Sequence, residues 1–145
     1  MRRSIFKMSL LTLSLLIFSI ACNKDDKADE GFSLVGTWSL EKVEVSANLP
    51  LVGELSDTDA DPFGTITFSN QGLGRTAYQF TLLNEPYASA GSFAWEKDGD
   101  TVTIVDAAGT DTWKILESSE KKLIAEWTEI MEGSEQGTYK IELSK

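Results

Sequence analysis

Histidine is absent from this 145-residue chain, and cysteine occurs only once, as Cys22. Without histidine the chain has no Ser-His-Asp or Cys-His catalytic group and no histidine-ligated metal. A single cysteine forms no internal disulfide. A pair of carboxylates could in principle hydrolyse glycosides, but the sequence places no two acids at the needed separation inside a cleft. We expect a protein that is not an enzyme and that carries no cofactor.

Positive charge is scarce. The chain has 13 Lys and Arg residues against 23 Asp and Glu residues, a net charge of -10. Nucleic acid is excluded as a partner, because its phosphates require cations for binding. A cationic ligand or a basic protein partner stays open. So does the simpler interpretation, in which the acids only keep the domain soluble.

The first 21 residues have the pattern of an export signal. Arg2, Arg3 and Lys7 form a charged start, and residues 8–20 form an apolar run interrupted only by Ser and Thr. This run is shorter than the roughly 20 apolar residues that a transmembrane helix needs. Ala21 supplies the small residue expected before a cleavage point. Residues 1–21 are therefore predicted to be a lipoprotein signal peptide.

The only cysteine follows this signal directly. The run Ser19-Ile20-Ala21-Cys22 resembles a lipobox, which implies that Cys22 is the site of lipid attachment. The alternative is a chance cysteine in an ordinary signal peptide. Residues 22–33 are charged and predict a flexible tether. We expect a lipid-anchored protein of the bacterial outer membrane that faces the periplasm or the cell surface.

From Gly36 onward the hydrophobic period is two, which is the period of β-strands. A change of phase near Glu41 and Lys42 indicates a β-bulge. Short links rich in Gly, Asp, Asn and Ser separate the segments, so consecutive strands should be antiparallel neighbours. The eight expected strands lie within residues 36–45, 65–69, 77–82, 92–96, 101–104, 112–115, 123–128 and 138–143.

Eight such strands form a sheet with one apolar face, and the sequence predicts no helix to cover that face. Closure of the sheet into a barrel would bury it. An all-β, eight-stranded, antiparallel up-and-down barrel is therefore predicted for residues 34–145, with an open sandwich as the alternative. One connection is long, from Ser46 to Pro62. Because long links without secondary structure tend to be lids or binding loops, we expect a lid there.

The segment Leu34-Val35-Gly36-Thr37-Trp38 resembles the opening of a lipocalin-like domain. The resemblance implies a meander of eight strands, a lid over the barrel mouth and a small apolar ligand inside. It also implies that Trp38 plugs the closed base. The arginine that covers this tryptophan in the family has no counterpart here, and the nearest cation is Lys145.

The meander gives the barrel a polarity. Strand one starts at the base, so residues 46–62, 84–90, 106–111 and 131–137 should surround the mouth. Aromatic side chains facing inward near this end are the predicted ligand contacts. They are Phe80, Phe93, Trp113, Trp127 and Tyr139. An eight-stranded barrel can also be filled by its own side chains. A monomeric interaction module whose acidic mouth engages a basic protein is then the alternative function.

The lid contains an acidic run, Asp57-Thr58-Asp59-Ala60-Asp61, which resembles the start of a calcium loop. The glycine and glutamate that such a loop needs are replaced by Pro62 and Phe68. We therefore predict no metal site and retain Asp57, Asp59 and Asp61 as a weak calcium candidate.

Overall fold

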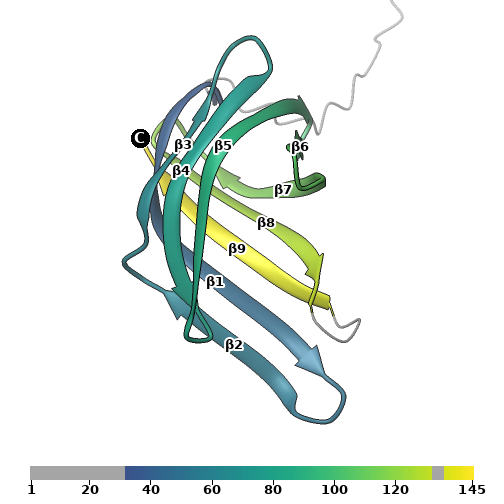
Figure 1. Cartoon of the computed structure of the whole chain (residues 1–145). Helices are drawn as coiled ribbons and strands as arrows, with labels where there is room; N and C mark the ends of the chain where they lie inside the picture. Colours follow the sequence, from purple (N-terminus) through teal and green to yellow (C-terminus); the bar gives the residue numbers. More distant parts are fainter. Residues whose placement is uncertain (1–31, 132–135) are drawn as a thin grey trace, which may run out of the picture.

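The computed structural model describes residues 32–131 and 136–145, and all regular elements within these residues are β-strands. Figure 1 shows them as one strongly curved sheet. The strands are β1 (Gly36–Leu49), β2 (Gly53–Asp59), β3 (Phe63–Phe68), β4 (Leu73–Leu82), β5 (Glu85–Asp98), β6 (Thr101–Val105), β7 (Thr110–Ser118), β8 (Lys122–Ile130) and β9 (Gln136–Ser144).

Eight of these strands form a closed ring. β1 pairs with β3, each later strand pairs with the next, and β9 pairs again with β1, always antiparallel. The predicted all-β barrel is thus confirmed. The ladder between β1 and β9 shifts register between Leu40 and Lys42, which confirms the predicted bulge.

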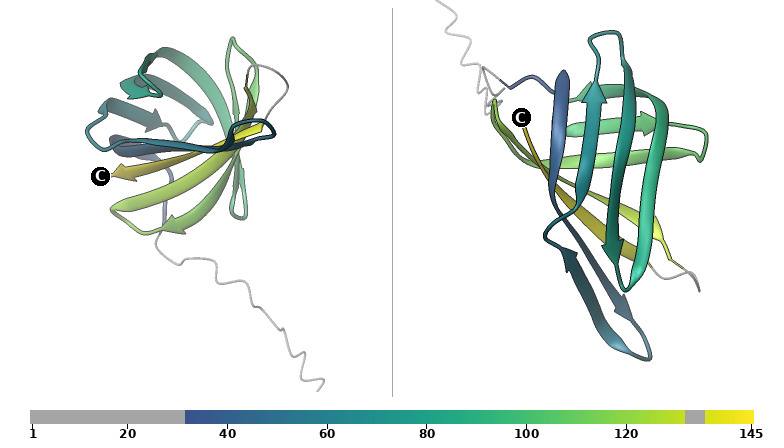
Figure 2. Two further views of the ribbon diagram at one scale, coloured as in Figure 1. Left: turned by 90° about the horizontal axis from the view of Figure 1, so that it is seen from below. Right: turned by 60° about the vertical axis from the view of Figure 1, so that its left-hand side comes forward.

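β2, the strand outside the closed ring, corrects the expectation of a lid. Ser46 to Leu49 belong to β1, and β2 pairs with β1 from Val43↔Asp59 to Leu49↔Gly53. The connection is therefore a β-hairpin. It projects beyond the other strands at the mouth end (Figures 1 and 2). The sequence signal was weak because most outward residues of β2 are polar and its inward positions include Asp57 and Asp59.

The base of the barrel is closed by Trp38. Its ring is fully buried, and its Nε1 donates a hydrogen bond of 2.8 Å to the carbonyl of Leu34. The Lys145 ammonium lies 4.2 Å from the centroid of the Trp38 ring. The same ammonium donates to the carbonyls of Ser33 and Val35, at 2.9 and 2.8 Å. Lys145 thus covers Trp38 from the end of the last strand.

The opposite end of the barrel opens because two ladders are short. β5 runs from Glu85 to Asp98, but it pairs with β6 only from Ala94 to Asp98. The ladder between β7 and β8 covers only Lys114 to Ser118 on β7. The first half of β5 is therefore paired with β4 but not with β6, and the second half of β8 is paired with β9 but not with β7. The ring is closed toward the base and splayed at the mouth.

Candidate functional site

One wall of the mouth is a ladder of three aromatic rings on neighbouring strands. Trp113 of β7 stacks on Trp127 of β8, with ring centroids 5.1 Å apart, and Trp127 stacks on Tyr139 of β9 at 5.3 Å. All three lie at inward positions, because Trp127 and Tyr139 are register partners and Trp113 pairs with the buried Val102. Trp127 is only half-buried, so part of its surface faces the opening.

The facing wall carries a second stack on β4 and β5. Phe80 lies between Tyr78 and Tyr87, with centroid distances of 5.8 and 5.1 Å. Tyr87 is 37% exposed. Tyr87 contributes to the raised pKa of Tyr139, so the phenol groups of the two stacks lie near each other at the mouth. The structure therefore brings together four of the five predicted ligand contacts and adds Tyr78 and Tyr87.

Phe93 is the predicted contact that the structure moves away. Its ring packs edge-on against Phe68, at 5.4 Å, and covers Gly74 on the neighbouring strand. Phe68 pairs with Gly36 at the start of β1, so this cluster belongs to the base. The prediction placed Phe93 too high because β5 is far longer than the segment 92–96 expected for it.

Small and polar residues occupy the inward positions of β5 between Tyr87 and Phe93. These are Ser89 and Gly91, and a Cβ atom built on Gly91 has no neighbour within 4 Å. Ser89 Oγ lies 2.8 Å from Thr76 Oγ1 on β4. This part of the wall leaves space beside the aromatic rings, with hydroxyl groups along it.

Two carboxylates also face the interior of the mouth. Asp111 is the register partner of the buried Ile104, and Glu129 follows Trp127 on the inward side of β8. Glu129 Oε1 accepts a hydrogen bond of 2.9 Å from Trp127 Nε1. Sequence reasoning assigned Asp111 to a loop and missed Glu129. Extending the alternation Leu123, Ala125, Trp127 by two residues would have found it.

The pKa shifts of nearby groups show how enclosed this region is. Burial raises the pKa of Tyr139 to about 12, with the Tyr87 ring and Glu129 contributing in the same direction. Burial also raises the pKa of Tyr78, against a hydrogen bond from Ser89 that lowers it. Glu129, Asp111 and Asp106 raise the Tyr78 pKa further, although Tyr78 stands on the facing wall. The carboxylates therefore act across the interior of the barrel.

Two carboxylates of the calcium candidate accept hydrogen bonds from backbone amides in and next to β4. Asp57 Oδ2 accepts a hydrogen bond from the Leu83 amide at 2.6 Å, and Asp59 Oδ2 accepts one from the Thr81 amide at 2.7 Å. Asp59 Oδ1 also accepts from the backbone of Asp61. These bonds tie β2 to β4, where no backbone ladder joins the two strands. Within residues 32–131 and 136–145, no group of three acidic or cysteine side chains could hold a metal ion.

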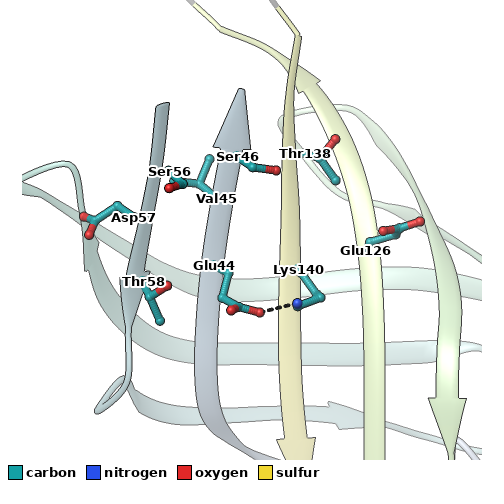
Figure 3. A pocket seen from close by; sticks show the side chains of 9 residues that line it. All are labelled: Glu44, Val45, Ser46, Ser56, Asp57, Thr58, Glu126, Thr138 and Lys140. Atoms are coloured by element: carbon teal, nitrogen blue, oxygen red, sulfur yellow. Dashed lines mark ion pairs between the residues drawn. The ribbon is translucent and has the colours of Figure 1, made fainter. Parts of the chain in front are cut away.

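An open groove of about 320 Å³ lies on the outer face of the sheet, across β2, β1, β9 and β8 (Figure 3). At its floor, Lys140 Nζ lies 2.5 Å from Glu44 Oε2. This contact, more than any other, holds the pKa of Glu44 below its usual value. Ser46 and Thr138 are register partners beside this ion pair. The groove is a polar, solvent-facing surface and contains none of the predicted ligand contacts.

The remaining predicted sites divide between the base and the undescribed segments. Trp38 lies at the base as described above. Cys22, with the leader and the tether as far as Gly31, lies outside the described residues, as do Glu132 and Glu135, which were predicted near the mouth. None of the described residues forms a helix long and apolar enough to cross a membrane.

A closed antiparallel meander, sealed by a tryptophan at one end and lined with aromatic rings at the other, defines the class of calyx-like barrels. The sequence profile of the lipocalin-like domain matches residues 34–125. Because this match covers more than half of the chain, the protein belongs to the lipocalin-like domain family. The resemblance inferred from the Gly36-Thr37-Trp38 motif is confirmed.

Solved structures with a similar fold are distant in sequence. A dog lipocalin allergen gives a TM-score of 0.48 at 10% identity, covering 78% of this chain and 74% of that one. Bovine odorant-binding protein in complex with undecanal gives 0.47 at 14% identity, covering 76% and 69%. A deswapped triple mutant of the bovine protein gives 0.46 at 14% identity, covering 76% and 72%. No curated protein sequence matches the chain.

Proposed function

We propose that this protein binds a small molecule with a flat apolar body in the splayed mouth of its barrel. The observation that carries this proposal is the pair of aromatic stacks on facing walls, with Trp127 and Tyr87 partly exposed between them. Aromatic walls with a few polar groups suit such ligands. Membership of the lipocalin-like family supports the same function, since its barrels typically hold small hydrophobic ligands.

Binding in this site can be tested with phenylnaphthylamine, a neutral probe whose emission rises in dry apolar surroundings. We expect Trp127→Ala to weaken binding by at least about tenfold, because it removes the central ring of the stack. Phe63→Ala is the matched control, since Phe63 is 72% exposed outside the mouth. No binding by the unmodified chain, or equal losses in the two variants, would refute a ligand site in the mouth.

A second function rests on a different observation. Residues 85–93 of β5 have a strand edge without a registered partner on the β6 side, and the charges of Asp106, Asp111 and Glu129 act on Tyr78 of the neighbouring strand β4. A basic protein segment could pair with this edge. Hydrogen exchange would show such pairing as protection of β5 amides on addition of a lysine-rich peptide, and unchanged exchange would eliminate it.

We further infer that the barrel is anchored to the bacterial outer membrane through lipid on Cys22, facing the periplasm or the cell surface. The support is the sequence of residues 1–33, with its charged start, short apolar run and single cysteine. Mass spectrometry of the membrane fraction tests the anchor directly. An intact bond between Ala21 and Cys22, or a free Cys22 thiol, would exclude it.

A further inference from the structure

The interior of the mouth contains negative charge at positions where a barrel usually places apolar side chains. Asp111 stands opposite Ile104, which is 8% exposed, and two residues from Trp113, which is 7% exposed. Glu129 follows Trp127 on the inward side of its strand and is hydrogen-bonded to that indole. These two residues are called the mouth carboxylates below.

No cation of the described chain compensates the mouth carboxylates. The five ion pairs among residues 32–131 and 136–145 use Lys42, Lys122 and Lys140, whose partners are Glu44, Glu117 and Glu142. All of these side chains lie on the outer face of the barrel. The ammonium of Lys145 lies at the base. None of the ion pairs within the described residues therefore includes Asp111 or Glu129.

Partial desolvation makes this imbalance costly for Asp111, although solvent still reaches its side chain. The pKa of Asp111 is raised, first by burial and then by repulsion from Glu129 and Asp106. Asp106 itself is occupied in a turn, where its Oδ1 accepts hydrogen bonds from Ala108 and Gly109. A partly buried carboxylate without a cation is unfavourable, and a bound cation removes the penalty. Carboxylates needed only for solubility would cost less on the outer face.

We propose that the ligand of this site carries a positively charged group, such as a primary ammonium, attached to its flat apolar body. The proposal rests on the proposed function, since it concerns the same site. The rings of Trp113, Trp127 and Tyr139 would contact the apolar body, and Asp111 and Glu129 would accept hydrogen bonds from the ammonium. Such charge-assisted bonds are shorter and stronger than neutral ones.

A matched pair of ligands separates the charge from the apolar body. Tryptamine and tryptophol share an indole ring and a two-carbon arm, and they differ in ending with an ammonium or a hydroxyl group. Their affinities would be measured by isothermal titration calorimetry on the full chain carrying Cys22→Ser, which has no acyl chains. At low ionic strength we expect tryptamine to bind at least about tenfold more tightly than tryptophol.

The variants identify the groups that cause the preference. In Asp111→Asn with Glu129→Gln, we expect the two affinities to agree within about twofold, with tryptophol binding retained. Glu126→Gln is the control for the loss of Glu129, because it removes one carboxylate charge from the outer side of β8 and should keep the preference. Circular dichroism and urea unfolding would establish that all variants remain folded.

The outcomes separate the two proposals. Equal affinities of tryptamine and tryptophol for the unmodified chain overturn the cationic ligand but leave a site for apolar ligands standing. A preference that survives in the double variant, or that Glu126→Gln also abolishes, overturns the role of the mouth carboxylates. Absence of binding by both ligands, together with absence of phenylnaphthylamine binding, overturns the proposed function and the cationic ligand with it.

Discussion

Lys145 is the last residue of the chain, and its ammonium group covers the base of the barrel. It contacts the Trp38 ring and donates to the carbonyls of Ser33 and Val35. These bonds connect the segment before β1 to the end of β9. Burial lowers the pKa of Lys145, so the group is partly desolvated where it makes these contacts.

Replacement of Lys145 should therefore destabilise the domain. We expect Lys145→Met to lower the free energy of unfolding by about 1–2 kcal/mol, because it removes a cation–π contact and two charge-assisted hydrogen bonds. Lys145→Arg should retain most of this stability. Urea unfolding measures the effect, and Lys114→Met is the control, since Lys114 is exposed on β7. Equal effects of the Lys145 and Lys114 replacements would contradict a specific role at the base.

Tyr139 gives a second prediction at the scale of a residue. Its folded pKa of about 12 lies above the ordinary value of 10.0, so folding favours the neutral phenol. The stability that Tyr139 contributes is therefore fully present below pH 10.0 and is lost as pH rises toward 12. The unmodified domain should lose stability steeply over this range, and Tyr139→Phe should lose less. Urea unfolding across the range, with the tyrosinate absorbance followed in parallel, checks both expectations.

Single residues also show where sequence reasoning succeeded. Trp113, Trp127 and Tyr139 were predicted as neighbours because alternation assigns each to the inner face, and the meander places their strands side by side. Tyr87 and Glu129 were missed because each lies beyond the apolar core of its strand, among residues that resemble a loop. The alternation of inward and outward positions continues through these two residues, but the alternation of hydrophobic and polar residues does not.

β2 is the strand that the sequence pattern did not predict. Its edge toward β4 is joined by the carboxylates of Asp57 and Asp59 instead of a backbone ladder. An acidic run of this kind is typical of a solvated loop, and only the register with β1 reveals a strand. β5 was underestimated for a related reason, because Pro86 and the small residues from Ala88 to Gly91 lack strand-forming side chains.

Hydrogen bonds accepted by Asp57 and Asp59 form the seam between β2 and β4. This seam should respond to mutation and to acid. The Leu83 amide, followed by the Thr58 amide, holds the pKa of Asp57 below its ordinary value of 3.8. The bond therefore stabilises the seam above pH 3.8 and is lost as pH falls through the lower folded value. We expect Asp57→Ala to speed hydrogen exchange of the Leu83 amide by about tenfold, after correction for intrinsic rates.

Asp61→Ala is the matched control for this experiment, because the Asp61 side chain lies in the same acidic run and is exposed. Its replacement should leave exchange at Leu83 unchanged. Acidification of the unmodified chain below the lowered folded pKa of Asp57 should reproduce the effect of Asp57→Ala. Unchanged exchange in Asp57→Ala would mean that other contacts hold the hairpin against β4.

For the whole molecule, the ring closure was predictable and the shape of the mouth was not. Short turns between alternating segments impose antiparallel neighbours, and eight such strands can close. The splaying depends on how far each ladder extends. β6 has only five residues, so β5 continues beyond it without a partner on that side. Ladder lengths depend on twist and on long-range pairing, which periodicity does not encode.

The polarity of the barrel determines how an anchored molecule would face its surroundings. The described chain begins at the base, where the Phe32 ring lies 6.1 Å from Trp38. The tip of the hairpin between β1 and β2 lies at the mouth end, and Leu51 there is 99% exposed. If the nine residues between Cys22 and Phe32 form the predicted flexible tether, they span about 17 Å. An anchor at Cys22 should therefore hold the base near the lipid and the mouth away from it.

Energy transfer to acceptor lipids tests this orientation. Leu51→Cys labels the mouth end, and Glu120→Cys labels the turn between β7 and β8 at the base. In vesicles carrying the lipidated protein, Cys22 is blocked by its acyl chains, so each variant takes one fluorophore. Transfer should be clearly more efficient from position 120 than from position 51, because the base lies nearer the bilayer. Equal transfer, or stronger transfer from position 51, would show that the mouth lies against the membrane.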